Sequence, residues 1–196
     1  MTRDASGTGK TGCSEKRTKA TDRRREQIRS KPARPMRHGG EHPRFVADVM
    51  LGRLAKWLRI AGFDVLYSNR FSDEELVAIS NRERRILLSR DTGLLVRKAV
   101  QDFIFLESED IGEQIRQILE ALRARRLPLM FTRCLECNET LVEAPRESVR
   151  DRIPAFVYRT QVRFMSCPKC GKVFWAGTHR RSAARTLGNL LPRSFS

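Results

Sequence analysis

Apolar residues in the middle of the chain fall into short runs, separated by longer stretches in which they recur at helical spacing. The short runs are bounded by charged or turn-forming residues, and apolar runs of this length are typical of buried strands. We predict four strands in this way, over residues 44–48, 63–68, 86–89 and 102–107.

The stretches between these runs predict helices. In residues 50–64 the apolar positions follow the i, i+3, i+4, i+7 pattern of an amphipathic helix, and Gly62 is placed to end it. In residues 72–85 the helix begins with a Ser-x-x-Glu capping box made by Ser72 and Glu75. Two further helices are expected over residues 92–100 and 110–126.

Strand and helix therefore alternate four times between residues 44 and 126. Such alternation predicts an α/β fold in which right-handed crossovers join parallel strands and helices cover both faces of the sheet. In open sheets of this kind, ligands and reacting groups gather beyond the carboxyl ends of the strands. We expect a functional site at that edge.

Three aspartates are expected there. Asp48 and Asp91 stand at the carboxyl end of a predicted strand. Asp73 lies at the start of a helix that enters from the same side. Carboxylates brought together repel one another unless a cation holds them, and Mg²⁺ or Mn²⁺ prefers such oxygen ligands. An ion held in this way can activate a water molecule and stabilise the charge that develops on a phosphodiester.

Each of these acids also has a purely structural interpretation. Asp48 and Asp91 can cap the helices that follow them, and Asp110 can do the same for the last helix of the domain. Asp73 lies in the first turn of a helix, where the helix dipole favours negative charge without any ligand. The metal site is supported by the joint placement of the acids rather than by any one of them.

The second half of the chain carries two Cys-x-x-Cys pairs separated by 29 residues. Each pair places two thiolates on one tight turn, and two such turns make a tetrahedral four-sulfur site that suits Zn²⁺. Because four sulfurs leave no open position, a structural ion is expected, with a redox pair of thiols as the alternative. The expected ligands are Cys134, Cys137, Cys167 and Cys170.

The net charge of +16 is unevenly distributed along the chain. Residues 1–44 carry a net charge of +8, residues 45–122 of −2, and residues 123–196 of +10. Basic flanks of this kind attract phosphate backbones, so nucleic acid is the expected partner, although such flanks also serve solubility.

Aromatic and basic residues alternate around the second cysteine pair. The aromatic rings can stack on bases while the cations meet phosphates, or the rings can simply form the core of a small ribbon. Arg90 can contact a phosphate or pair with a carboxylate, and His179 can contact the substrate or form a local hydrogen bond. The candidate nucleic-acid contacts are Arg90, Lys172, Trp175, His179 and Arg180.

These patterns divide the chain into a disordered basic tail (1–43), an α/β domain (44–126), a zinc ribbon (127–182) and a C-terminal tail (183–196). The first segment has almost no large apolar residues to bury. No apolar run is long enough to span a membrane, and the N-terminus lacks the apolar segment of a secretory signal. Cysteines that bind a metal rather than form disulfides suggest a reducing, cytoplasmic location in such a chain.

Several segments together resemble the Mut-seven C-terminal ribonuclease family over about residues 44–182. They are "DVMLGRLAKWLRIAGFDV", "SDEEL", "ILLSRDTGLL", "CLEC", "CPKC" and "FWAGTH". The resemblance implies a PIN-like domain, which is a three-layer α/β/α sandwich around a parallel sheet, followed by a zinc ribbon. It also implies hydrolysis of single-stranded RNA that depends on Mg²⁺ or Mn²⁺.

By matching position, the resemblance assigns the catalytic acids to Asp48, Asp73 and Asp91. PIN-like sites often use a fourth acid, for which Glu74 and Asp110 are the candidates. The favoured hypothesis is thus a metal-dependent endoribonuclease whose ribbon and basic flanks grip RNA. The alternative is a non-catalytic RNA-binding or adaptor module in which the acids serve only as caps; a protein partner or a homo-oligomer is left open.

Overall fold

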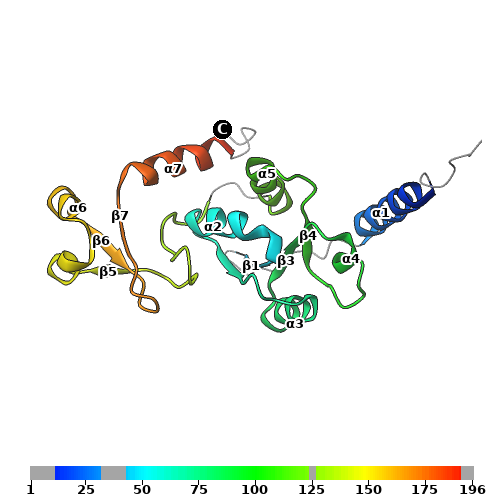
Figure 1. Ribbon diagram of the computed structural model, residues 1–196, viewed down its shortest axis with the longest axis horizontal. Coiled ribbons are helices and arrows are strands. Elements are labelled where there is room, and N and C mark those ends of the chain that lie inside the picture. Colours follow the sequence, from blue (N-terminus) through cyan, green and yellow to red (C-terminus); the bar gives the residue numbers. More distant parts are fainter. Residues whose placement is uncertain (1–11, 32–42, 124–126, 191–196) are drawn as a thin grey trace, which may run out of the picture.

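The computed structural model describes residues 12–31, 43–123 and 127–190, with side chains from residue 19 onward. Figure 1 shows an elongated molecule with a parallel sheet at its centre. Helix α1 (Gly12–Ser30) lies at one end and a small antiparallel ribbon at the other.

Four parallel strands form the central sheet. They are β1 (Arg44–Ala47), β2 (Asp64–Tyr67), β3 (Ile86–Ser89) and β4 (Phe103–Phe105). Their order is β2-β1-β3-β4, and the register pairs Val46 with Leu66 on one side and with Leu87 on the other. The predicted α/β class with parallel strands is confirmed.

The strand order places a topological switch between β1 and β3. The chain leaves β1 toward β2 on one side and leaves β3 toward β4 on the other. In a parallel sheet with right-handed crossovers, this reversal opens a crevice beyond the carboxyl ends of the two strands. Asp48 and Asp91 lie just past those two carboxyl ends.

Helices cover both faces of the sheet because the strand side chains alternate between two cores. Phe45 and Ala47 of β1 face the core that contains residues of α2 (Gly52–Ile60) and α5 (Ile111–Ala121). Val46 faces the opposite core, which is closed by α3 (Asp73–Glu83) and α4 (Thr92–Leu95). The fold is therefore the predicted three-layer α/β/α sandwich.

Local sequence signals begin and end these helices as predicted. Gly62 has a φ of +93°, and a Cβ at this position would lie 2.5 Å from the carbonyl oxygen of Leu129. Only glycine tolerates both the conformation and the close approach. Ser72 and Glu75 form the predicted capping box at the start of α3.

The ribbon is a separate antiparallel sheet. Its strands are β5 (Val142–Ala144), β6 (Phe164–Ser166) and β7 (Val173–Trp175), in the order β5-β6-β7. A 3-10 helix (Arg146–Arg152) and α6 (Ala155–Thr160) connect β5 to β6. Helix α7 (Thr178–Leu190) follows the ribbon and runs back to α5, as Figure 1 shows.

Helix α1 lies inside the segment 1–43, for which the sequence predicts disorder. Its contacts explain the difference, because Ile28 is buried in the core beside α3 and α4. Arg29 pairs with Glu107 at 2.9 Å, and the Lys31 ammonium donates to the Leu95 carbonyl oxygen at 2.6 Å. Residues 1–11 and 32–42 of the predicted tail lie outside the described residues.

The other predicted tail, 183–196, also differs from the structure over its described part. Helix α7 extends to Leu190, whereas the sequence places the end of the ordered region at residue 182. Leu187 is buried in the core that contains α5, and Leu190 packs against the same core. A helical apolar pair thus anchors the C-terminal segment, and residues 191–196 lie outside the described residues.

A search of the described helices for a membrane-crossing segment finds none with sufficient length and apolar character.

Candidate functional site

A buried hydroxyl group connects two of the predicted acids at the carboxyl edge of the sheet. Ser89, the last residue of β3, donates from Oγ to Asp48 Oδ2 at 2.6 Å. The same Oγ accepts a hydrogen bond from the backbone N–H of Asp91 at 2.9 Å. A hydrogen bond this short to a carboxylate is charge-assisted, so it fixes the orientation of Asp48.

Asp48 is 6% exposed, although burial of a carboxylate is costly unless the group is well partnered. It precedes a 3-10 helix (Val49–Leu51), but its side chain makes no capping hydrogen bond to that helix. The capping interpretation therefore does not explain why an acid stands at this position.

Asp91 is more exposed than Asp48 and does cap a helix. Its Oδ1 accepts a hydrogen bond from the backbone N–H of Gly93 at 2.6 Å, at the start of α4. Arg24 of α1 lies near the same turn: a Cβ on Gly93 would be 3.1 Å from Asp91 Oδ1 and 3.4 Å from Arg24 Nη1. The basic helix α1 thus brings a guanidinium group to the neighbourhood of a predicted catalytic acid.

Asp73 and Glu74 share one cation. Arg97 Nη2 is 2.6 Å from Asp73 Oδ2, and Arg97 Nη1 is 2.9 Å from Glu74 Oε1. Hydrogen bonding to its own backbone N–H and to Arg97 holds the pKa of Glu74 below its usual value. Arg97 thus holds both acids at the start of α3 in this conformation.

Asp110, the other candidate for a fourth acid, caps α5. Its Oδ1 accepts a hydrogen bond from the backbone N–H of Glu113 at 2.9 Å. Nearby, Arg90 Nη2 pairs with Glu109 Oε1 at 2.6 Å, and the buried Nε of Arg90 has no hydrogen-bond partner among the described residues. The structural role of Asp110 is thus visible, and Arg90 retains one unused donor.

Within the described residues, one group of three or more His, Cys, Asp or Glu ligand atoms lies within 4.8 Å of one another, and it consists of the four predicted cysteines. Asp48, Asp73 and Asp91 do not form such a group, and Asp73 is held by Arg97 instead. Their assignment as one catalytic centre stays a prediction.

The cysteine cluster has the geometry of a tetrahedral metal site. The Sγ atoms of Cys134 and Cys170 are 3.7 Å apart. A tetrahedron with zinc–sulfur bonds of about 2.3 Å has edges of about 3.8 Å, so this pair of sulfur atoms is already spaced for Zn²⁺. All four sulfur atoms lie within 4.8 Å of one another.

The two cysteine turns have matching backbones. In each turn the second cysteine directs its N–H toward the first sulfur at 3.5 Å, from Cys137 to Cys134 and from Cys170 to Cys167. The next residue is left-handed in both: Asn138 has a φ of +65° and Gly171 a φ of +73°. Asparagine and glycine are the residues that adopt this conformation most readily, which explains their places after the pairs.

Without an ion, the four thiols cannot all be ionised at neutral pH. The hydrogen bond with Cys170, together with burial, raises the pKa of Cys137 to about 12. The backbone N–H of Lys172, followed by the hydrogen bond with Cys137, lowers the pKa of Cys170 to about 7. Zinc ligands are thiolates, so a bound dication would stabilise the ionised form of all four sulfur atoms.

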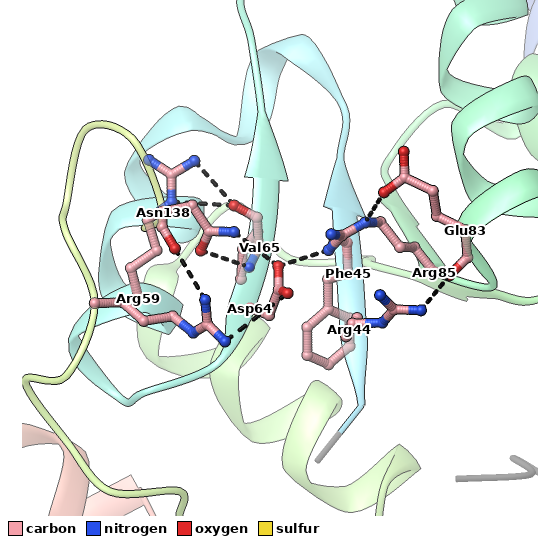
Figure 2. Close-up of polar contacts among 9 residues, drawn as sticks. Arg44, Phe45, Arg59, Asp64, Val65, Glu83, Arg85 and Asn138 are labelled. Carbon is pink, nitrogen blue, oxygen red and sulfur yellow. Dashed lines mark hydrogen bonds and ion pairs between the residues drawn. The ribbon is translucent and has the colours of Figure 1, made fainter. Parts of the chain in front are cut away.

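The first cysteine turn is attached to the outer edge of β2, as Figure 2 shows. Asn138 accepts from the Val65 N–H at 2.9 Å and donates to Asp64 Oδ1 at 2.7 Å. Arg59 of α2, which is 3% exposed, donates to the Val65 carbonyl at 2.9 Å and to the Leu135 carbonyl at 2.6 Å. Both outward backbone groups of Val65 are therefore satisfied by side chains.

Asp64 and Arg85 continue this network along the amino ends of the strands (Figure 2). Arg85 Nη1 is 2.6 Å from Asp64 Oδ1, and Arg85 Nε is 2.8 Å from Glu83 Oε2. Burial by itself raises the pKa of Asp64, but hydrogen bonds from Arg85 and Asn138 outweigh it and leave the pKa below its usual value. The ribbon is thus fixed near the amino ends of the strands, whereas the predicted acids lie at the carboxyl ends.

The remaining candidate nucleic-acid contacts lie on the ribbon and α7. Lys172 pairs with Glu136 at 3.2 Å, across the two cysteine turns. Trp175, His179 and Arg180 line a cavity between the ribbon and α7.

The sequence patterns did not indicate roles for three residues. In the structure, Arg59 and Asn138 bind the backbone of Val65, and Ser89 binds Asp48. Arg59 had a signal, because it lies four residues after the buried Ala55 on the apolar face of α2. Asn138 also had one, since it follows its cysteine pair as Gly171 follows the other.

Comparison with known proteins identifies one family. The model of the Mut7-C RNAse domain family matches residues 43–187, which include the sheet, both cysteine turns and most of α7. Searches of curated proteins and of solved structures return no match. The family match covers most of the chain, which therefore belongs to the Mut7-C RNAse domain family.

Proposed function

We propose that this protein is a metal-dependent ribonuclease that hydrolyses phosphodiester bonds of single-stranded RNA. The proposed domains are the nuclease domain over residues 44–126 and the RNA-gripping zinc ribbon over 127–182, which α7 extends. The observation that carries the proposal is Asp48: a buried acid at the switch point, oriented by Ser89 and free of any capping role.

Asp48 and Asp91 would provide the first oxygen ligands for Mg²⁺ or Mn²⁺, and the donor set fits a hard dication. Such an ion would supply an activated water and stabilise developing negative charge on the phosphate. Because Ser89 contacts both residues, it would keep the two ligands in a fixed relation while RNA binds.

Asp73 would join the site only by exchanging Arg97 for the ion. The Asp73–Arg97 pair is 40% exposed on each side chain, and exposed pairs of this type contribute about 0–1 kcal/mol. The free energy lost with this ion pair is small compared with the free energy that a carboxylate gains by binding a dication. Glu74, which shares Arg97, is the nearest candidate for a fourth ligand.

The test is cleavage of labelled single-stranded RNA by the purified protein with Mg²⁺, Mn²⁺ or a chelator. We expect cleavage only with a divalent ion, and we expect Asp48→Asn and Asp91→Asn each to remove it while RNA affinity changes little. A circular RNA substrate will be opened if cleavage is endonucleolytic. Asp151→Asn, an exposed acid of the ribbon, is the matched control and should cleave normally.

A different set of results favours the non-catalytic alternative. Metal-independent binding without cleavage, with Asp48→Asn and Asp91→Asn indistinguishable from wild type, would identify an RNA-binding or adaptor module. The basic charge of residues 123–196 supports binding under either function.

A further inference from the structure

A cavity of about 500 Å³ lies between the ribbon and α7, and nothing in the proposed catalytic edge uses it. One wall comes from β6 and β7 and contains Met165, Phe174 and Trp175. The facing wall comes from residues 129–133 and from the first turns of α7. A cavity of this size is within the range that proteins use for small ligands.

Three of the residues that line this groove are aromatic: Phe131, Phe174 and Trp175. Phe131 lines the groove, and the guanidinium of Arg180 stacks over the Phe131 ring with 4.7 Å between the Arg180 Cζ and the ring centroid. Phe131 has a φ of +64°, a conformation that L residues adopt at a cost. Its backbone N–H is bound to the Ile60 carbonyl at 2.9 Å, which holds the ring in place despite that cost.

The charges around the groove have one sign. Arg133, Arg163 and Arg180 line it together with His179, and none of the described lining residues is acidic. The side chains of Arg163 and His179 have no ion-pair or hydrogen-bond partner among the described residues. Arg133 is partly engaged, since it donates to the Asn138 carbonyl at 2.9 Å, and Arg180 lies over Phe131. The groove therefore presents aromatic rings beside Arg163 and His179, whose side chains are available to a ligand.

We propose that this groove binds an unstacked base of single-stranded RNA, with the phosphates on either side of that base held by the arginines. A nucleobase offers a flat face for the aromatic rings, and its flanking phosphates complement the uniform positive charge. A purely apolar partner would leave the arginines desolvated and unpaired, which is unfavourable.

The groove and the acidic edge lie at opposite ends of α2. Asp48 stands shortly before the helix begins, and Ile60, its last residue, lines the groove. The nine residues of α2 span about 13 Å at about 1.5 Å per residue. This inference rests on the proposed function in one respect: the base held here would belong to the same RNA strand, away from the bond that is cleaved.

Tryptophan fluorescence can test the proposal directly, because the chain has two tryptophans and one lines the groove. In a Trp57→Phe, Asp91→Asn protein, Trp175 is the sole indole, and on the proposed function RNA should stay intact. We expect an oligouridylate to quench this fluorescence on binding, and an abasic oligomer of equal length and charge to quench it much less. Near-ultraviolet and far-ultraviolet circular dichroism will establish that the protein is folded.

Substitutions in that background locate the effect. Phe131→Leu should weaken oligouridylate binding between about fivefold and a hundredfold, the range expected for loss of stacking on one base, and should leave abasic binding nearly unchanged. Arg180→Gln, on the exposed side of α7, is a second variant that tests the same site without altering the strained position. Phe156→Leu is the matched control, since Phe156 is an aromatic residue of the ribbon outside the groove and 68% exposed.

The proposal is overturned if the abasic oligomer quenches Trp175 as strongly as oligouridylate, or if Phe131→Leu, Arg180→Gln and Phe156→Leu bind RNA alike. It is also overturned if sedimentation shows that the free protein self-associates through the groove and that RNA does not compete. Cleavage assays on the wild-type active site give a separate answer. Loss of base binding with intact cleavage rejects this inference alone, and base binding without cleavage rejects the ribonuclease proposal alone.

Discussion

The hydroxyl of Ser89 donates a hydrogen bond to the carboxylate of Asp48 at 2.6 Å, and this bond joins β3 to the end of β1 at the switch point of the sheet. Because the same oxygen receives the N–H of Asp91, one small side chain sets the relation between two acids that are 43 positions apart in the sequence.

We predict that Ser89→Ala destabilises the protein by about 1–3 kcal/mol, the usual cost of removing a hydrogen bond to a buried charged group. Cleavage should fall with it, because Asp48 loses its fixed orientation. Ser89→Thr keeps the hydroxyl and should restore most of both properties. Urea unfolding followed by circular dichroism, with cleavage rates on the same samples, checks this; an unchanged unfolding midpoint for Ser89→Ala would contradict it.

The Asp64 network predicts a dependence of stability on pH. The pKa of Asp64 is lowered on folding from an unfolded value of 3.8, so the folded state binds its proton less readily than the unfolded state. Its stabilising contribution is fully present above about pH 5 and is lost as the pH falls below 3.8 and through the folded pKa.

Asp64→Asn should therefore cost about 1–3 kcal/mol at neutral pH, and the difference from wild type should shrink as the pH is lowered through this window. Denaturant unfolding at several pH values measures the effect. Asp151→Asn, which changes an exposed acid of the ribbon, should unfold like the wild type at each pH. A constant difference between Asp64→Asn and wild type down to pH 2 would count against the assignment.

Removal of zinc should release the ribbon while the sandwich stays folded. The ribbon has only two small apolar clusters, so most of its folding free energy would come from the metal. After chelation we expect fast amide hydrogen exchange over β6 and β7 and at Val65, whose N–H is bound by Asn138, with β3 still protected. Protection of β6 and β7 that survives complete loss of zinc would show that the ribbon folds without an ion.

The sequence predicted the sheet well because each strand and helix there carries its own local signal. The capping box of Ser72, the glycine at position 62 and the apolar run before Ser89 all act within a few residues. The cysteine cluster was equally predictable, because two Cys-x-x-Cys turns are the usual sequence pattern of a four-sulfur metal site.

Long-range pairings could not be predicted in this way. Nothing in the neighbourhood of Asp73 indicates that Arg97, 24 positions later, takes its carboxylate. Likewise, α1 is so polar that its composition indicates disorder, and only its docking on the sandwich through Ile28, Arg29 and the following Lys31 explains its order. Asp48 and Asp91 do lie just past the carboxyl ends of β1 and β3, but the partners of the acids depend on tertiary contacts.

The attachment of the first cysteine turn to Val65 has a consequence for the stability of the protein against aggregation. A bare outer strand exposes unpaired N–H and C=O groups that can recruit a strand from another molecule. Here Asn138 and Arg59 occupy those groups on β2. These two side chains therefore shield the outer edge of β2 from pairing with a strand of another molecule.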